Sequence, residues 1–261
     1  MTSWLYNNLP QAILLDLGLL KIYWYGLFIT LAIVVSVIVF LKLTKNQQQV
    51  QTHFWNLFIY LIIFGLIGAR FYHVIFYNLN YFISQPIEIL MLWHGGLAIH
   101  GAIIAGLLVI YLYTKKHQLL FWIYTDLLTL VLPLGQAIGR WGNYFNQELY
   151  GKSCDFDWCI PIQNQLEHFH PVFLYESFLN LILFLVLLII FKSKKLSAGL
   201  ITCGYLIGYS IMRFFMEFLR LDVSQTIGGL KWVQWLCLVV IVVSGVGISK
   251  TQCEALPRNK N

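Results

Sequence analysis

The chain has 261 residues, of which 59% are hydrophobic and only 11% are charged. Because soluble domains carry about 25% charged residues, this composition excludes an ordinary soluble domain and indicates a protein of the lipid bilayer. The formal net charge of +6 would suit nucleic acid, but most of the lysines lie in short segments between apolar runs. That placement is typical of membrane proteins, so we expect no nucleic-acid partner.

Apolar windows of about 20 residues predict seven membrane-spanning helices and an all-α integral membrane protein. The whole chain, residues 1–261, is expected to form one membrane domain, since no solenoid-type repeat or low-complexity tract interrupts it. A polar segment between the fourth and fifth windows, residues 139–171, is long enough to form a small cap. The predicted spans are approximately residues 20–41, 55–76, 95–114, 119–138, 172–191, 199–217 and 232–249.

The basic residues predict how the chain is oriented in the membrane. They concentrate after the first, third and fifth spans and in the tail, and the positive-inside rule places these segments in the cytoplasm. The N-terminus and the cap are then extracytoplasmic, and the C-terminus is cytoplasmic. The cytoplasmic set comprises Lys42, Lys45, Lys115, Lys116, Lys192, Lys194, Lys195, Lys250, Arg258 and Lys260. The opposite side has only Lys21, Arg140, Lys152, Arg220 and Lys231 outside the spans.

Polar side chains within the spans cluster at one predicted depth. Consecutive spans alternate in direction, so depths can be compared, and nearly all of these residues fall in the outer third of the membrane. Charge inside a bilayer is costly and marks functional sites, and groups at one depth describe a pocket rather than a conduction path. The exception is Asp126, nearer the cytoplasm. The outer set comprises Tyr25, Arg70, His100, Arg140, Tyr175, Glu176, Arg213 and Glu217.

Several of these residues also have simpler interpretations. Arg70 could extend its side chain to the outer headgroups. Arg213 and Glu217 are spaced i,i+4 and could pair on one helix face. His100 could be a packed structural histidine, and Tyr25 could belong to an interfacial aromatic belt.

The chemistry of these groups favours transfer of a phosphate-bearing substrate. Arginine offers a planar fork of donors to phosphate oxygens, and an imidazole such as His100 can accept a proton near neutral pH. The chain has no evident serine or cysteine nucleophile among these residues, so direct transfer between two bound substrates is expected. No histidine and carboxylate cluster has the spacing of a metal site, and we expect neither metal nor cofactor.

The cysteines divide into two kinds. Cys203 and Cys237 lie within apolar runs and are expected to be inert core residues. Cys154 and Cys159 share one polar loop and could form a disulfide if that loop faces an oxidising space.

The stretch Gly139 to Gly151, sequence GRWGNYFNQELYG, follows directly on the apolar run 119–138. It resembles the signature of bacterial prolipoprotein diacylglyceryl transferases, which reads G-R-x-G-N-(aromatic or apolar)-x-N-x-E-x-x-G. Further stretches agree with the family in order along nearly the whole chain. They are Trp24-Tyr25-Gly26, Gly95 to Gly101, His170-Pro171 with Leu174-Tyr175-Glu176, and Arg213-Phe214 with Glu217-Phe218 and Arg220.

The resemblance implies a seven-helix enzyme of the bacterial inner membrane that moves the diacylglyceryl group of phosphatidylglycerol to the lipobox cysteine of preprolipoproteins. Its partners would be phosphatidylglycerol, preprolipoprotein signal peptides and the bilayer. By matching position, Arg140 and Arg213 are implied to surround the phosphate, and His100 and Tyr25 to lie near the reacting centre. We take His100 as the general base. The other matched positions are Asn143, Asn146, Glu148, Gly151 and Glu217.

The sequence departs from the family pattern at two places. Val172 and Phe173 stand where the family often has Thr or Ser followed by Gln, and Leu221 alone separates Arg220 from Asp222.

Two rival functions stay open. A carrier for an anionic lipid or solute is a first alternative, with Asp126 as its only support. A structural membrane protein whose outer arginines only grip headgroups is a second.

Overall fold

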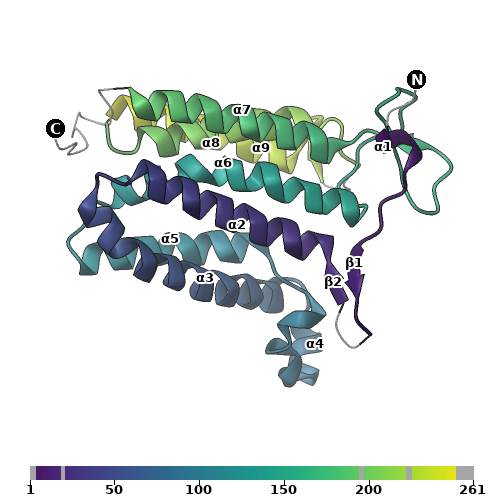
Figure 1. The fold of residues 1–261 in the computed structure, drawn as a ribbon, viewed down its shortest axis with the longest axis horizontal. Coiled ribbons are helices and arrows are strands. Elements are labelled where there is room, and N and C mark those ends of the chain that lie inside the picture. The colour runs from purple at the N-terminus through teal and green to yellow at the C-terminus, as the bar shows by residue number, and fades with distance from the viewer. Residues whose placement is uncertain (1–3, 19–20, 194–196, 222–224, 251–261) are drawn as a thin grey trace. The chain divides into compact units, whose positions relative to one another are not determined.

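The computed structural model describes residues 4–18, 21–193, 197–221 and 225–250 (Figure 1). Within these ranges, five helices are long and apolar enough to cross a membrane, and two further apolar helices follow them. The prediction of a helical multi-pass membrane protein is confirmed, and the count of seven spans stays a prediction. Five residues used above, Lys194, Lys195, Asp222, Arg258 and Lys260, and the side chain of Lys250 lie outside the described residues.

Each predicted span corresponds to one apolar helix. The fourth of these helices, α6, runs seven residues past the predicted end of its span, so residues 139–145 are helical. Arg140 therefore lies within α6. The seven helices are α2 (Trp24–Leu43), α3 (Gln48–Phe76), α5 (Ile99–Lys116), α6 (Phe121–Phe145), α7 (Val172–Lys192), α8 (Leu200–Met216) and α9 (Trp232–Lys250).

Short elements outside the spans were not predicted, because they are too short to show a periodic pattern. Three are two-stranded antiparallel pairs: β1 (Ile13–Asp16) with β2 (Lys21–Tyr23), β3 (Ile160–Pro161) with β4 (His168–Phe169), and β5 (Thr226–Ile227) with β6 (Leu230–Lys231). The others are the short helices α1 (Trp4–Asn7) and α4 (Leu79–Ser84) and the 3₁₀ turns Pro86–Ile89 and Leu92–His94.

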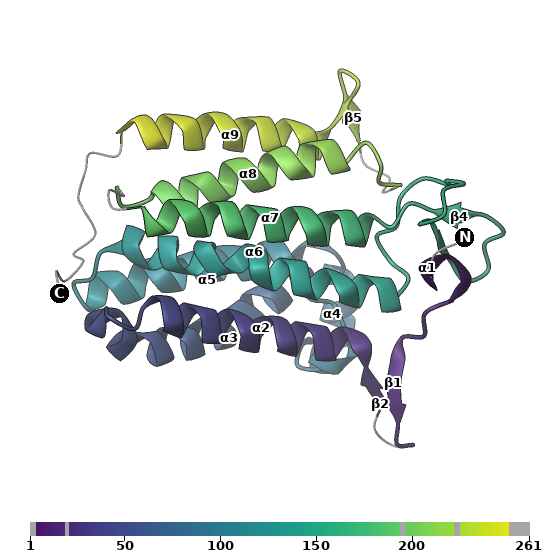
Figure 2. The ribbon, with the colours of Figure 1, turned by 45° about the horizontal axis from the view of Figure 1, so that its top comes forward.

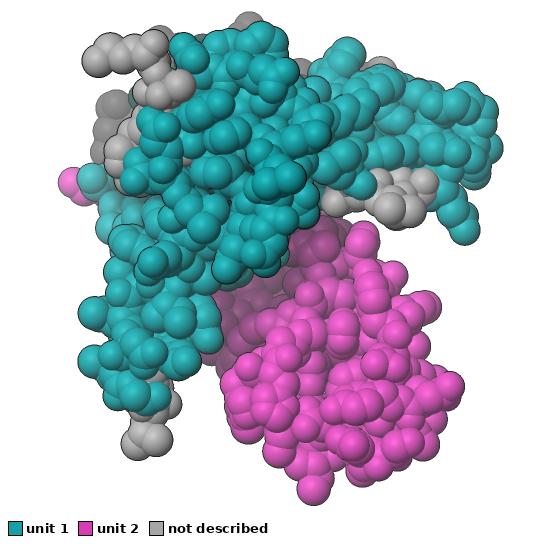
Figure 3. All heavy atoms as spheres, turned by 90° about the vertical axis from the view of Figure 1, so that its right-hand side faces the viewer, with its two compact units in different colours: residues 1–43, 126–257 teal, residues 44–125, 258–261 magenta. Residues whose placement is uncertain are grey.

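The chain divides into two compact units, which Figure 3 shows in different colours. The first comprises residues 1–43 and 126–257, and the second comprises residues 44–125 and 258–261. In the first unit, α8 packs between α7 and α9, as Figures 1 and 2 show.

Glycines bring α2 and α6 close together within the first unit. A Cβ atom on Gly135 would lie 3.0 Å from Ser36 Oγ, and one on Gly142 would lie 2.6 Å from Tyr25 Cδ2. Small residues allow such close approach between membrane helices. At Gly142 the glycine of the signature therefore accommodates the Tyr25 ring.

Asp126 joins α6 to the start of α8. Its carboxylate accepts hydrogen bonds from Gly199 N at 2.7 Å, Thr202 N at 2.8 Å and Thr202 Oγ1 at 2.6 Å. The two backbone donors are N–H groups of the kind that a helix leaves unsatisfied at its N-terminus. Asp126, the only residue that supported the carrier hypothesis, thus has a structural role in the fold.

In the second unit, α3 and α5 meet almost backbone to backbone. A Cβ atom on Gly68 would lie 2.6 Å from the carbonyl oxygen of Gly101, and one on Gly101 would contact the Gly68 carbonyl in turn. These two glycines set the distance between the two helices.

Candidate active site

The signature arginine Arg140 lies in a buried ion-pair cluster of the first unit. Its Nε is 2.7 Å from Oε2 of Glu176 on α7, and the other oxygen, Oε1, accepts a hydrogen bond from Arg220 Nη1 at 3.3 Å. The Glu176 side chain is only 1% exposed. A buried carboxylate is stable only when it is well compensated, and two guanidinium groups compensate this one.

A second cluster surrounds Arg213 at the end of α8. Arg213 Nη2 is 2.7 Å from Glu217 Oε2, so the predicted i,i+4 pair is confirmed. The other carboxylate oxygen, Oε1, is 3.2 Å from Nζ of Lys231, at the end of β6. Glu217, like Glu176, is a buried carboxylate shared by two cations.

The two clusters form one network. Lys231 Nζ also donates hydrogen bonds to the carbonyl oxygens of Arg220 at 3.1 Å and Glu217 at 3.4 Å. A chain of contacts thus links Arg140 on α6 to Arg213 on α8, and their shared role at a phosphate stays a prediction. Among the described contacts, the network joins four cationic side chains to two carboxylates. Its members are Arg140, Glu176, Arg220, Lys231, Glu217 and Arg213.

Arg213 retains donor capacity. Arg213 Nη1 is buried, and within the described part of the chain it has no hydrogen-bond partner. Glu176 Oε2 and Glu217 Oε2 also lack a directed hydrogen bond, although each lies 2.7 Å from a guanidinium nitrogen. These two contacts are therefore close charge pairs whose N–H bonds do not point at the oxygens. Guanidinium donors that are not used up by carboxylates suit an added oxyanion.

The carboxamides of the signature connect Arg140 to Glu148. Arg140 Nη1 donates to Asn143 Oδ1 at 3.4 Å, and Asn143 Nδ2 donates to Glu148 Oε1 at 2.8 Å. Asn146 Nδ2 reaches the same oxygen at 3.4 Å. These bonds orient the end of α6 and the loop that follows it.

Gly151 lies where the cap meets the end of α8. Its N–H donates to the His170 carbonyl at 2.9 Å, and it forms an isolated bridge with Arg220. A Cβ atom there would lie 2.9 Å from Val172 Cγ2 and 3.0 Å from the Leu219 carbonyl oxygen. Close packing alone accounts for the glycine. Val172 itself is fully buried, so this departure from the family pattern replaces a polar side chain with an apolar core contact.

His100 belongs to the second unit, so its convergence with the arginines stays a prediction. It is an exposed residue in the first turn of α5, and its ring lies beside that of Tyr72 with a centroid separation of 5.7 Å. The backbone before it turns at Gly95 and Gly96, where φ is +83° and +77°, values that favour glycine.

Arg70 holds the loop that leads to His100. It is 5% exposed, which argues against the simpler interpretation that it extends to the headgroups. Its guanidinium donates to the Ile89 carbonyl at 3.1 Å and the Gly96 carbonyl at 3.0 Å. The carbonyls of Glu88, Met91 and Gly95 complete the set. Five carbonyl oxygens satisfy its donors and thereby fix the loop between α3 and α5.

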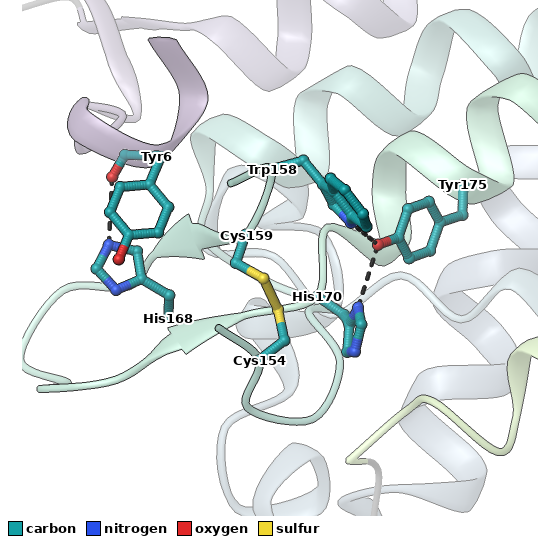
Figure 4. The surroundings of a disulfide bond; sticks show 7 residues. All are labelled: Tyr6, Cys154, Trp158, Cys159, His168, His170 and Tyr175. Atoms are coloured by element: carbon teal, nitrogen blue, oxygen red, sulfur yellow. Dashed lines mark hydrogen bonds between the residues drawn. A yellow bond between two sulfur atoms is a disulfide. The ribbon is translucent and has the colours of Figure 1, made fainter. Parts of the chain in front are cut away.

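The segment between α6 and α7 contains the Cys154–Cys159 disulfide, which confirms the pairing considered above (Figure 4). Next to it, Tyr175 Oη accepts a hydrogen bond from Trp158 Nε1 at 2.9 Å and lies 3.1 Å from His170 Nδ1. Cys203 and Cys237 are buried free cysteines, as expected.

Sequence reasoning placed Glu176 in the outer polar set but assigned no site role to Arg220 or Lys231. Arg220 had a usable signal, because it stood in a matched stretch. Lys231 had none beyond its charge, because no motif includes it.

The family model and the similar proteins assign the chain to one family. The family model of prolipoprotein diacylglyceryl transferase matches residues 12–249. A phosphatidylglycerol–prolipoprotein diacylglyceryl transferase of Synechococcus elongatus is 40% identical over 252 residues, covering 92% of this chain and 86% of the relative. The relative of the same name from Thermotoga maritima is 41% identical, covering 88% and 81%. That from Finegoldia magna is 39% identical, covering 87% and 90%.

Proposed function

The chain belongs to the prolipoprotein diacylglyceryl transferase family, and on that premise we propose that it transfers the diacylglyceryl group of phosphatidylglycerol to the lipobox cysteine of preprolipoproteins. In this reaction the cysteine thiol loses its proton and the sulfur bonds to the terminal glyceryl carbon. The bond from that carbon to the phosphate oxygen breaks, and glycerol phosphate leaves with the electron pair. The thioether product is the first intermediate of bacterial lipoprotein maturation.

The observation that carries this proposal is the cluster of cationic side chains that joins Arg140 to Arg213, in which Arg213 Nη1 is buried and has no hydrogen-bond partner among the described residues. The phosphodiester of phosphatidylglycerol carries one negative charge. The departing phosphate monoester gains a second as the carbon–oxygen bond breaks, since its second pKa is about 6. A network of cationic side chains with an unused guanidinium donor binds the charge that develops better than the charge of the ground state. That difference is what lowers a barrier.

The roles of the individual residues follow from this arrangement. Arg140 and Arg213 bind the phosphate, and Glu217 holds Arg213. Asn143, Asn146 and Glu148 orient the headgroup together with Arg140, while Gly151 allows the cap to approach α8. Tyr25 lies near the reacting carbon, and His100 accepts the thiol proton. The signature match and the contacts of Arg140 and Arg213 support these assignments.

We place the enzyme in the bacterial inner membrane as one domain with seven spans. The N-terminus and the cap, residues 139–171, face outward, and the C-terminus faces the cytoplasm. The distribution of lysines supports this orientation. The disulfide within the cap also supports it, because disulfides persist in oxidising compartments.

The direct test is transfer by the purified protein in detergent. Labelled diacylglycerol should pass from phosphatidylglycerol to a lipobox peptide, and glycerol phosphate should appear in equal amount. A matched peptide with serine in place of the lipobox cysteine should remain unlabelled. Failure of well-folded protein to label the cysteine peptide would refute the proposal.

A further inference from the structure

Lys231 lies in the middle of the ion network, although no motif of the chain includes it. Its Nζ is 3.2 Å from Glu217 Oε1 and 3.1 Å from the Arg220 carbonyl oxygen. The side chain is 21% exposed, so it is largely screened from solvent. Lys231 is the last residue of β6, in the short strand pair β5–β6 between α8 and α9.

The backbone at Lys231 is fixed independently of its side chain. Lys231 N donates to Gln234 Oε1 at 2.9 Å, and Gln234 Nε2 donates to the Phe214 carbonyl at 3.2 Å. Gln234 is 2% exposed, so these bonds are shielded from water. They tie the start of α9 to the end of α8.

Lys231 determines which carboxylate oxygen of Glu217 faces Arg213. A carboxylate opposite a single arginine commonly binds both prongs of the guanidinium fork. Here Lys231 occupies Oε1, and Arg213 contacts only Oε2, at 2.7 Å. Arg213 Nη1 is then left without a hydrogen-bond partner among the described residues.

We propose that Lys231 is a positioning residue for the phosphate site. It holds Glu217 so that Arg213 Nη1 is available to an anionic headgroup. The inference rests on the proposed transferase function and names a determinant of lipid binding outside the family signature.

The test compares Lys231→Met with wild type in mixed micelles, varying the mole fraction of phosphatidylglycerol at fixed peptide concentration. We expect kcat/KM for the lipid to fall about tenfold, mainly through a higher KM, because a charge-assisted contact to the phosphate is weakened. The KM for the peptide should not change. Lys231→Arg should recover most of the loss, since it restores the charge.

Lys21→Met is the matched control. It removes the same charge from an exposed pair with Asp16, 3.8 Å apart, on β1–β2, and should leave the lipid KM unchanged. Loss of folded protein would lower kcat without raising the lipid KM. If Lys231→Met does not fold, Lys231→Gln removes the charge but retains a donor for the Arg220 carbonyl.

The outcomes separate the two proposals. An inactive, folded wild type refutes the transferase function itself. An active wild type whose lipid KM is the same in the folded Lys231 variant refutes only the role of Lys231.

Discussion

At the scale of single residues, the arginines show how one side-chain type serves opposite purposes. Arg70 uses its donors on backbone carbonyls and is purely structural. Arg213 has the same guanidinium, but one of its nitrogens lacks a hydrogen-bond partner within the described residues. The difference lies in the neighbours, because a loop surrounds Arg70 and a shared carboxylate faces Arg213.

Arg140→Lys tests the forked donor at the centre of the signature. Lysine keeps the charge but cannot contact Glu176, Asn143 and a phosphate oxygen with fixed geometry at the same time. We expect kcat/KM to fall by roughly 100-fold, the scale of losing one preorganised oxyanion donor. Steady-state transfer assays measure kcat/KM, and thermal unfolding in detergent verifies that the variant is folded. Turnover within a few fold of wild type would contradict the phosphate role.

At the scale of elements, helix ends depend on neighbours as well as on hydropathy. The apolar window predicted that the fourth span would end at residue 138, but α6 continues to Phe145. Hydropathy measures which segment lipid can surround. Beyond that segment α6 persists because Asn143 and Glu148 pair with one another and because Tyr144 packs against the chain that follows α6.

Gly101→Ala tests the contact between α3 and α5. The added methyl group would meet the Gly68 backbone, which cannot move away as a side chain could. We expect a loss of about 1–3 kcal/mol in unfolding free energy, the usual cost of overpacking. Gly106→Ala on the same helix is the control. There the methyl group meets only Leu61 Cδ2 at 3.7 Å, so we expect a neutral to slightly stabilising effect. Equal melting temperatures for both variants would contradict the prediction.

Asp126→Asn tests the attachment of α6 to α8. The amide offers one acceptor oxygen where the carboxylate uses two, and its NH₂ group would face a backbone N–H. We expect about 1–2 kcal/mol of destabilisation, measured by thermal unfolding, with transfer per folded molecule unchanged. Asp16→Asn, in an exposed pair, should have little effect. Loss of transfer without loss of stability would assign Asp126 a functional role, as the carrier hypothesis requires.

At the scale of the whole molecule, the distribution of charge predicts the orientation. A C-terminal fusion to green fluorescent protein should fluoresce, and a periplasmic reporter at the same position should be inactive, because the C-terminus is cytoplasmic. A reporter inserted at the tip of the cap, near Leu166, should show the reverse pattern, since this residue is fully exposed and tolerates insertion. A cytoplasmic cap would overturn the orientation and leave the Cys154–Cys159 disulfide in a reducing compartment.

The sequence alone was sufficient for the helical membrane class, the approximate positions of the apolar helices and the family. These depend on local composition and on contiguous motifs, which can be read along the chain. Only the tertiary structure decided that Arg140 faces Glu176, that Asp126 binds the start of α8, and that Lys231 shares Glu217 with Arg213. Such pairs join residues that are far apart in sequence. Their formation depends on how helices pack and where short strands end, which no local pattern specifies.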